Sequence, residues 1–294
     1  MHDALSILAT SPAGYVFAVV LGLLFGSFAN VCIYRWPPSE AHPHGRSVVR
    51  PGSHCFACGA PIRWYDNVPL ASYLWLRGRC RACKAAFSPR YLLVEALTGA
   101  LFGVAFWFTL GTGGLLSGSL EHRGLAFLVD AAFVWVMVVV TFIDLDHKLI
   151  LNKLTIPSMI AFYGASLVLG GPWWGGLVGA AIGYGVPWLI GELYLRLRKR
   201  EGLGLGDGML LAVVGALLGW RGVVIALFGG SVIGSVLGIA AIIAARRKAE
   251  PAEGEDEPGL MTTELPFGPF LALAAVFYLF GEPWIQLHFT LAGG

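Results

Sequence analysis

Residues 202–208 read Gly-Leu-Gly-Leu-Gly-Asp-Gly, and an apolar run, 209–219, follows directly. Four glycines therefore surround one carboxylate, that of Asp207. Because glycine has no side chain, another segment can lie close beside this acid. The stretch is not the Gly-x-Gly-x-x-Gly dinucleotide fingerprint, since no strand precedes it and the position of the third glycine falls on Asp207 or Met209. Two interpretations stay open from this stretch alone: a site built on Asp207, or an interhelical loop whose acid caps the next helix.

The composition predicts an all-α polytopic membrane protein. Of 294 residues, 56% are hydrophobic and only 13% are charged, and the mean hydropathy is +0.71. Such a chain is too apolar to keep its surface in water. Apolar runs of about 20 residues, some of them shorter, predict about eight transmembrane helices. They occupy residues 12–34, 91–110, 125–143, 154–169, 174–195, 209–219, 222–245 and 265–280.

The distribution of basic residues predicts the orientation in a bacterial cytoplasmic membrane. With the amino terminus outside, eighteen of the twenty Lys and Arg residues fall in loops on the cytoplasmic side, and only Arg123 and Arg221 fall outside. This is the positive-inside pattern. No basic residue precedes the first span, which is therefore predicted to be an uncleaved anchor. The net charge of +2 argues against a nucleic-acid partner, so membrane lipid is the expected environment.

A soluble loop between the first two spans carries two C-x-x-C pairs. Twenty-one residues separate the pairs Cys55/Cys58 and Cys80/Cys83, a spacing typical of a structural zinc site with four thiolate ligands. Two disulfides, or thiols that bind no ligand, are the alternative, and a reducing cytoplasmic location disfavours the disulfides. We therefore predict three parts: a first transmembrane helix (1–34), a small cytoplasmic domain with a four-cysteine, zinc-ribbon-like site (35–90), and a transmembrane core (91–294).

A second acid, Asp144, ends the run 125–143. Both Asp144 and Asp207 lie at the predicted cytoplasmic ends of spans, so they share one membrane face. Asp146 points elsewhere on a helix and is interpreted, with His147 and Lys148, as a solvated or supporting group. Carboxylates within spans are costly, and three others, Glu95, Asp130 and Glu192, are interpreted as boundary or packing acids.

Small residues recur at helical spacing and predict close helix packing. Glycines at 175, 179 and 183, and again at 230, 234 and 238, are four residues apart. In the first span, Ser27 and Asn30 are interpreted as polar packing residues.

The chain resembles the type IV prepilin peptidases, which are the leader peptidases and N-methyltransferases of pilus and type II secretion systems. The resemblance covers nearly the whole chain. It is carried by the cysteine tetrad and by the segments 26–31 (GSFANV), 64–69 (WYDNVP), 77–80 (RGRC), 142–144 (FID), 204–207 (GLGD) and 266–269 (PFGP). The segment 150–152, Ile-Leu-Asn, departs from it, since many relatives have a proline and an acid there.

The resemblance implies a Gly-x-Gly-Asp membrane aspartyl protease whose catalytic residues are Asp144 and Asp207. Gly204 and Gly206 are then expected to give the substrate backbone access to the site. The implied substrates are prepilins or pseudopilins, cut on the cytoplasmic side after a short basic leader. The implied methyl donor is S-adenosylmethionine, and structural Zn²⁺ is expected at the tetrad.

Two other classes of function remain as alternatives. One is a transporter with paired carboxylates, which would more often place them near the bilayer midplane, and the other is a zinc-bearing assembly scaffold without enzymatic activity. A stretch of five acids within residues 250–257 is interpreted as a solvated loop, with attraction of basic leaders as the second interpretation.

Overall fold

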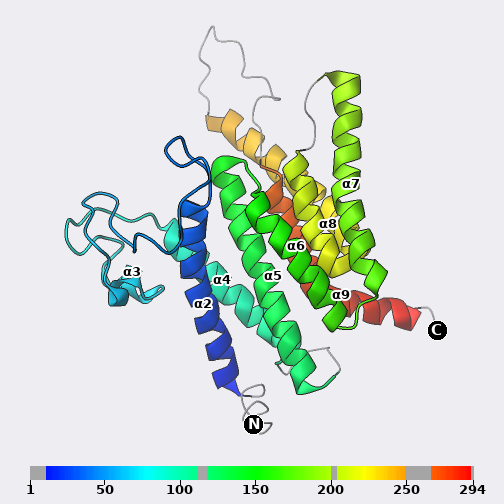
Figure 1. Ribbon diagram of the computed structural model, residues 1–294, viewed down its shortest axis with the longest axis horizontal. Coiled ribbons are helices and arrows are strands. Elements are labelled where there is room, and N and C mark those ends of the chain that lie inside the picture. The colour runs from blue at the N-terminus through cyan, green and yellow to red at the C-terminus, as the bar shows by residue number, and fades with distance from the viewer. Residues whose placement is uncertain (1–10, 112–117, 200–203, 249–265, 293–294) are drawn as a thin grey trace. The chain divides into compact units, whose positions relative to one another are not determined.

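The computed structural model describes residues 11–111, 118–199, 204–248 and 266–292. Within these ranges all regular elements are helices, apart from three isolated β-bridges (Figure 1). The acidic stretch 250–257 lies outside the described residues. The helices are α2 (Pro12–Arg35), η1 (Trp64–Asn67), α3 (Ala71–Trp75), α4 (Arg90–Thr109), α5 (Leu120–His147), α6 (Asn152–Val168), α7 (Trp173–Arg198), α8 (Leu205–Lys248) and α9 (Gly268–Ala292).

Five of the described helices are long and apolar enough to cross a membrane, namely α2, α4, α5, α7 and residues 205–240 of α8. The chain is therefore a multi-pass membrane protein. Each predicted apolar run falls mostly within a helix, although the runs 91–110 and 154–169 extend one residue past α4 and α6, and α9 begins only at Gly268. Within α8, Gly219 has a non-helical backbone (φ 65°, ψ −171°). It divides the helix between the two predicted runs, 209–219 and 222–245.

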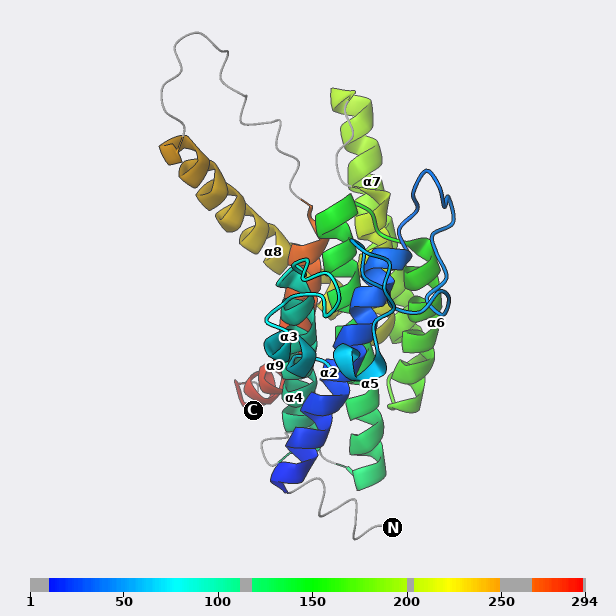
Figure 2. The same ribbon diagram turned by 90° about the vertical axis from the view of Figure 1, so that its left-hand side faces the viewer.

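The first of two compact units comprises Met1–Ile143 and Leu279–Gly294. Its helices α2 and α4 lie side by side (Figure 2). A Cβ on Gly22 would lie 2.8 Å from the Cα of Gly99, so the two backbones meet where neither has a side chain. The side-chain amide of Asn30 donates to the carbonyl of Tyr91 at 3.1 Å, again joining α2 to α4. The packing role predicted for Asn30 is thus confirmed.

The second unit, Asp144–Tyr278, is built around α7 and α8. A Cβ on Gly179 would lie 2.3 Å from the carbonyl oxygen of Gly215, and one on Gly183 would lie 2.3 Å from that of Leu211. Such distances are well inside van der Waals contact, so only glycine permits this approach. The close packing predicted from the glycine row 175–183 is confirmed at these two positions.

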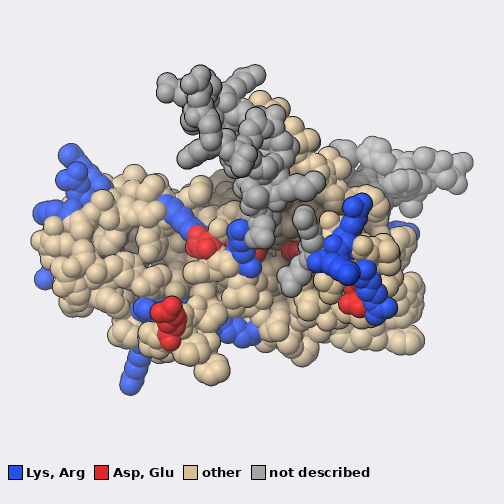
Figure 3. Space-filling model, turned by 90° about the horizontal axis from the view of Figure 1, so that it is seen from above, with Lys and Arg blue, Asp and Glu red and all other residues tan. Residues whose placement is uncertain are grey.

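The outward surface of the helices is apolar. α7 alone exposes Trp188, Leu189 and Leu193, each by about half of its surface. On the face seen in Figure 3, most of the surface comes from residues other than Lys, Arg, Asp and Glu. A surface of this kind is stable against hydrocarbon rather than water.

Candidate active site and metal centre

Asp144 lies in the last turn of α5, which ends three residues later at His147. Only 6% of the residue is exposed. Its backbone carbonyl accepts a hydrogen bond from the N–H of Lys148 (2.8 Å), whose positive φ of 48° ends the helix. Its side-chain Oδ2 accepts a hydrogen bond from the backbone N–H of Gly268 at 3.0 Å. A backbone donor therefore fixes this carboxylate from the start of α9.

Asp207 lies in the first turn of α8. The backbone N–H of Asp207 donates to the carbonyl of Gly204 at 3.1 Å, which closes the turn. The helix N-terminus carries a partial positive charge, which favours a carboxylate there. The carboxylates of Asp207 and Asp144 are close enough to interact electrostatically. The second unit thus brings together the two acids that the sequence places 63 positions apart.

The glycines around Asp207 have three different surroundings. A Cβ on Gly208 would meet the carbonyl oxygen of Tyr184 at 3.3 Å, so this glycine packs against α7. A Cβ on Gly206 would meet the Cβ of Ile150 at 3.1 Å. Beside Gly204 the nearest atom is Oδ2 of Asp207 itself, at 3.4 Å. Among the residues that the structure describes, none other than Gly206 and Asp207 comes within 4 Å of a Cβ at Gly204.

Ile150 lies between the two acidic segments. Its Cβ faces Gly206, and its Cδ1 would be 3.4 Å from a Cβ on Gly268. An apolar side chain at this place lowers the local dielectric, which strengthens interactions between the neighbouring charges. Two interacting carboxylates titrate as a pair, so one can be ionised while the other carries the proton. The arrangement can accept a proton and donate one within the same site.

The four loop cysteines form one cluster. The ligand atoms of Cys55, Cys58, Cys80 and Cys83 all lie within 4.8 Å of one another. A tetrahedral zinc with Zn–S bonds of about 2.3 Å has sulfur–sulfur edges of about 3.8 Å. The Sγ atoms of Cys55 and Cys83 are 3.8 Å apart. The donor set and its spacing therefore fit a closed four-thiolate metal site.

The two cysteine turns have the same backbone pattern. In the first turn, the N–H of Cys55 donates to the carbonyl of Ala60, and the N–H of Gly59 donates to the carbonyl of Cys55. In the second turn, the N–H of Cys80 donates to the carbonyl of Ala85, and the N–H of Lys84 donates to the carbonyl of Cys80. Gly59 and Lys84 both have positive φ, 69° and 62°. The two sulfur atoms of one turn therefore lie next to the two sulfur atoms of the other turn.

The thiol of Cys80 is prepared for ionisation. A hydrogen bond from the backbone of Cys83 is the largest influence on it and lowers the pKa of Cys80 to about 7. The thiolate is the form that binds metal. The pKa of Cys83 shifts the other way: a hydrogen bond from the backbone of Ala85 lowers it, but burial and the neighbouring thiols raise the pKa of Cys83 to about 11. The thiols of the cluster therefore titrate together rather than one by one.

The other predicted boundary acids have individual partners. Glu192 pairs with Arg196 at 2.7 Å, one turn along α7. Asp130 lies near a second acid, Glu282, and two like charges repel each other. Glu95 accepts a hydrogen bond from the backbone N–H of Leu70 at 2.9 Å. Of these three acids only Glu192 belongs to the second unit, and its charge is already paired.

Gly268 and Ile150 were not predicted as parts of the site. Residues 266–269 contributed to the resemblance, but nothing in the sequence shows that the amide of Gly268 reaches Asp144. Ile150 was noted only as a departure from related sequences. The sequence feature that could have pointed to Gly268 is its place at the start of an apolar helix, where a backbone N–H has no partner within the helix.

The fold and the site define a class of protein. It is a multi-pass helical membrane protein with two interacting carboxylates at the ends of two helices and, in a loop, a cluster of four cysteines that could hold a metal ion. Residues 20–109 match the bacterial peptidase A24 N-terminal domain, and residues 131–239 match the type IV leader peptidase family. The chain belongs to this leader peptidase family.

Curated relatives cover nearly the whole chain. The prepilin leader peptidase/N-methyltransferase of Stutzerimonas stutzeri is 34% identical over 94% of this chain and 94% of its own length. That of Pseudomonas aeruginosa is 32% identical over 98% of both chains. That of Aeromonas salmonicida is 36% identical over 87% of this chain and 86% of its own. No solved structure gives a significant match.

Proposed function

We propose that this protein is a prepilin leader peptidase that also N-methylates the new amino terminus. The observation that carries the peptidase assignment is the pairing of Asp144 with Asp207, with Asp144 held by the amide of Gly268, in a chain of this family. The names of the curated relatives support both activities.

The two carboxylates divide the chemistry of peptide hydrolysis. The ionised acid takes a proton from water, whose oxygen attacks the scissile carbonyl carbon. The protonated acid donates a hydrogen bond to the carbonyl oxygen as negative charge develops there. The protons then return through the same pair to the leaving amine. No step needs a metal at this site.

The scissile bond must be extended, because a helix within lipid hides its carbonyls in its own hydrogen bonds. The small number of described neighbours around Gly204 supports access of an extended backbone to Asp207. Gly206 is proposed as the adjoining backbone contact. The substrate class is a prepilin or pseudopilin, whose short basic leader precedes a long apolar helix.

The eight predicted apolar runs are proposed to cross the bacterial cytoplasmic membrane. Gly219 then separates a short crossing in α8, 209–219, from a longer one, 222–245. The charge distribution supports an outside amino terminus, a cytoplasmic four-cysteine loop and cytoplasmic carboxylates. We propose the division into 1–34, 35–90 and 91–294, with a structural zinc ion folding the middle part. S-adenosylmethionine is the proposed methyl donor.

Co-expression with a candidate prepilin tests the function. Intact-mass measurement of the pilin should show loss of the leader and a gain of one methyl group, both dependent on this protein. Transport of a small molecule without cleavage would favour the transporter alternative. Pilus assembly that needs the cysteines but tolerates Asp144→Asn would favour the scaffold.

A further inference from the structure

The short helix α3 lies along a membrane span rather than beyond its end. The backbone N–H of Leu70, the residue before α3, donates to the carboxylate of Glu95 at 2.9 Å. Glu95 follows the first residue of the span α4, Arg90, by five positions, which is about 7.5 Å along a helix axis. The headgroup layer on each side of the hydrocarbon core is roughly 5–8 Å thick. The start of α3 therefore lies at the depth of the headgroups.

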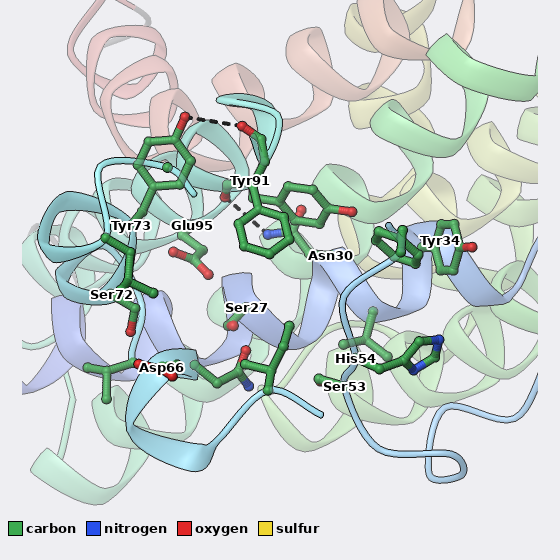
Figure 4. Close-up of a pocket in the computed structure, with 18 of the residues that line it drawn as sticks. Ser27, Asn30, Tyr34, Ser53, His54, Asp66, Ser72, Tyr73, Tyr91 and Glu95 are labelled. Carbon is green, nitrogen blue, oxygen red and sulfur yellow. Dashed lines mark hydrogen bonds between the residues drawn. The ribbon is translucent and has the colours of Figure 1, made fainter. Parts of the chain in front are cut away.

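One face of α3 contacts the protein and another points away from it. A cavity lies among α2, the start of α4 and the loop that carries the cysteine cluster, and Ser72, Tyr73 and Glu95 are among the residues that line it. Figure 4 shows Ser72 and Tyr73 on the same side of this cavity as Glu95. Leu74 and Trp75 do not line it, and they are 68% and 83% exposed. Such exposure is unfavourable in water, whereas tryptophan is enriched at membrane–water interfaces.

A tight turn follows α3 and fixes the residues after it. Arg77 and Gly78 both have positive φ, 52° and 65°. The N–H of Gly78 donates to the carbonyl of Tyr73 at 2.8 Å, and the carbonyl of Gly78 accepts from the N–H of Phe87 at 2.7 Å. A Cβ on Gly78 would lie 2.8 Å from the ring of Tyr73, so glycine is required where the ring covers the turn. The turn is therefore held against α3 and against the second cysteine turn.

A basic hollow opens on the surface beside this turn. It is lined by Trp75, Leu76, Arg77, Arg79, Cys80 and Lys84. Three of these side chains are cationic and none is anionic. Among the residues that the structure describes, none forms an ion pair with Arg77, Arg79 or Lys84. Like charges gathered in one hollow repel each other, so a bound anion would be stabilised there.

The rest of the loop leaves this positive charge uncompensated. Residues 35–90 contain nine Lys and Arg residues but only two acids, Glu40 and Asp66. Asp66 already pairs with Arg81 at 2.6 Å. The hollow therefore keeps its three cations available for a ligand from outside the loop.

We propose that the hollow binds the phosphate of an anionic phospholipid, while Leu74 and Trp75 insert among the neighbouring lipids. A soluble anion would account for the three cations but not for the exposed apolar pair at headgroup depth, whereas a lipid accounts for both. The long side chains of Arg and Lys can reach a phosphate while their stems lie on apolar surface. The contact would hold the cysteine cluster at the membrane surface through Cys80. This role goes beyond the proposed peptidase and methyltransferase activities.

Photocrosslinking of the full chain in lipid nanodiscs tests the site. The discs contain neutral phosphatidylcholine and a minority of phosphatidylglycerol, and a photoreactive benzoylphenylalanine replaces Trp75. Irradiation should attach lipid to the peptide that contains position 75, and the adduct masses identify which lipid it is. Phosphatidylglycerol should be enriched roughly threefold or more over its share in the disc, because each Lys or Arg near the surface favours anionic lipid. Adducts in the ratio of the disc composition, or mainly to another protein chain, would overturn the proposal.

A charge-matched pair of variants locates the binding in the hollow. Arg77→Gln, Arg79→Gln and Lys84→Gln together should abolish the enrichment. Arg46→Gln, Arg50→Gln and Arg63→Gln remove the same charge from the same loop outside the hollow, and this set should keep the enrichment. Equal losses in both sets would show that only the net charge of the loop matters and would refute a site. Gel filtration and thermal unfolding show whether each set is folded.

Competition by inorganic phosphate separates a lipid from a soluble anion without further variants. Phosphate is added at constant ionic strength, so that screening does not change. The enrichment of phosphatidylglycerol at position 75 should persist, since the lipid is also held by its contact with Leu74 and by its place in the bilayer. Loss of the enrichment in phosphate would assign the hollow to a soluble anion and overturn the lipid site. This measurement decides the question even if the triple variant of the hollow does not fold.

Discussion

The backbone N–H of Gly268 donates to Oδ2 of Asp144 across 124 positions of the chain. This contact joins the start of α9 to the end of α5 and leaves no room for a side chain at 268. A Cβ there would lie 2.6 Å from the same oxygen. The position of the carboxylate therefore depends on a residue with no functional group of its own.

Gly268→Ala should reduce cleavage roughly ten- to a hundredfold, because the methyl group displaces either the carboxylate or its charged hydrogen bond, which is worth about 1.5–3 kcal/mol. The initial rate of prepilin cleavage in detergent checks it. Gly164→Ala is the matched control, since a Cβ on that helical glycine has no neighbour within 4 Å. Equal rates for both variants would show that this hydrogen bond does not position Asp144.

The membrane helices were predictable from sequence because most apolar runs are long and are bounded by charged residues, Pro or Gly. The break at Gly219 was predictable for the same reason, since the runs 209–219 and 222–245 are separate in the sequence. The closeness of Asp144 and Asp207 was predictable only in part. The sequence places both acids at helix ends on the same membrane face, but it does not show that they are neighbours there. The contacts of Gly268 and Ile150 were not predictable, because they depend on side-chain packing between distant segments.

The cavity at Glu95 was also beyond sequence reasoning. Its walls come from α2, α4 and a loop with little regular structure, and the path of such a loop is set by its cysteine cluster and tertiary contacts rather than by periodicity. From the sequence, Glu95 is interpreted as a boundary acid. Its position in the sequence does not indicate that its carboxylate accepts a hydrogen bond from the backbone N–H of Leu70.

Gly183→Ala should destabilise the second unit. The added methyl group would lie 2.3 Å from the carbonyl oxygen of Leu211, so α7 and α8 must separate. Overpacking of this kind costs about 1–3 kcal/mol. Thermal unfolding in detergent measures it, with Gly185→Ala as control, because that position on α7 has no neighbour within 4 Å. A variant at 183 as stable as the control would contradict the close packing.

Cys80→Ser should release the metal from the loop. Elemental analysis of the wild type should find near-stoichiometric zinc, and the variant should lose it, because a closed site needs all four thiolates. Limited proteolysis should then cut within residues 35–90. Cys32→Ala, which removes the buried thiol in α2, should keep its zinc. Purified active protein with four free thiols and no metal would refute the zinc assignment.

Single-cysteine labelling should confirm the orientation. In a cysteine-free background, Ser53→Cys should resist a membrane-impermeant thiol reagent until the cytoplasmic membrane is opened, since Ser53 belongs to the basic loop. Ser119→Cys, in the loop before α5, should react without that step. Labelling of position 53 in cells with an intact cytoplasmic membrane would reverse the topology.

Asp144→Asn and Asp207→Asn should each lower cleavage by several orders of magnitude. Asparagine keeps the size of the side chain but neither carries the charge nor exchanges the proton, while acid and base assistance each contribute roughly 10²–10⁴-fold. Both variants should still insert in the membrane. The double variant should be little worse than either single one, because groups that act as a unit are not additive. The pH profile of the wild type should be bell-shaped, and its two limbs belong to the pair rather than to either acid.

Asp146→Asn is the internal control for this pair. Asp146 is exposed, two residues after the buried Asp144 on α5, and so faces a different direction. It should retain most of the cleavage rate, measured against the same prepilin. A dead Asp146→Asn beside a fully active Asp144→Asn would move the first catalytic acid to position 146. Normal cleavage by Asp144→Asn, Asp146→Asn and Asp207→Asn alike would refute the peptidase mechanism, because the proposed hydrolysis takes both its base and its acid from these carboxylates.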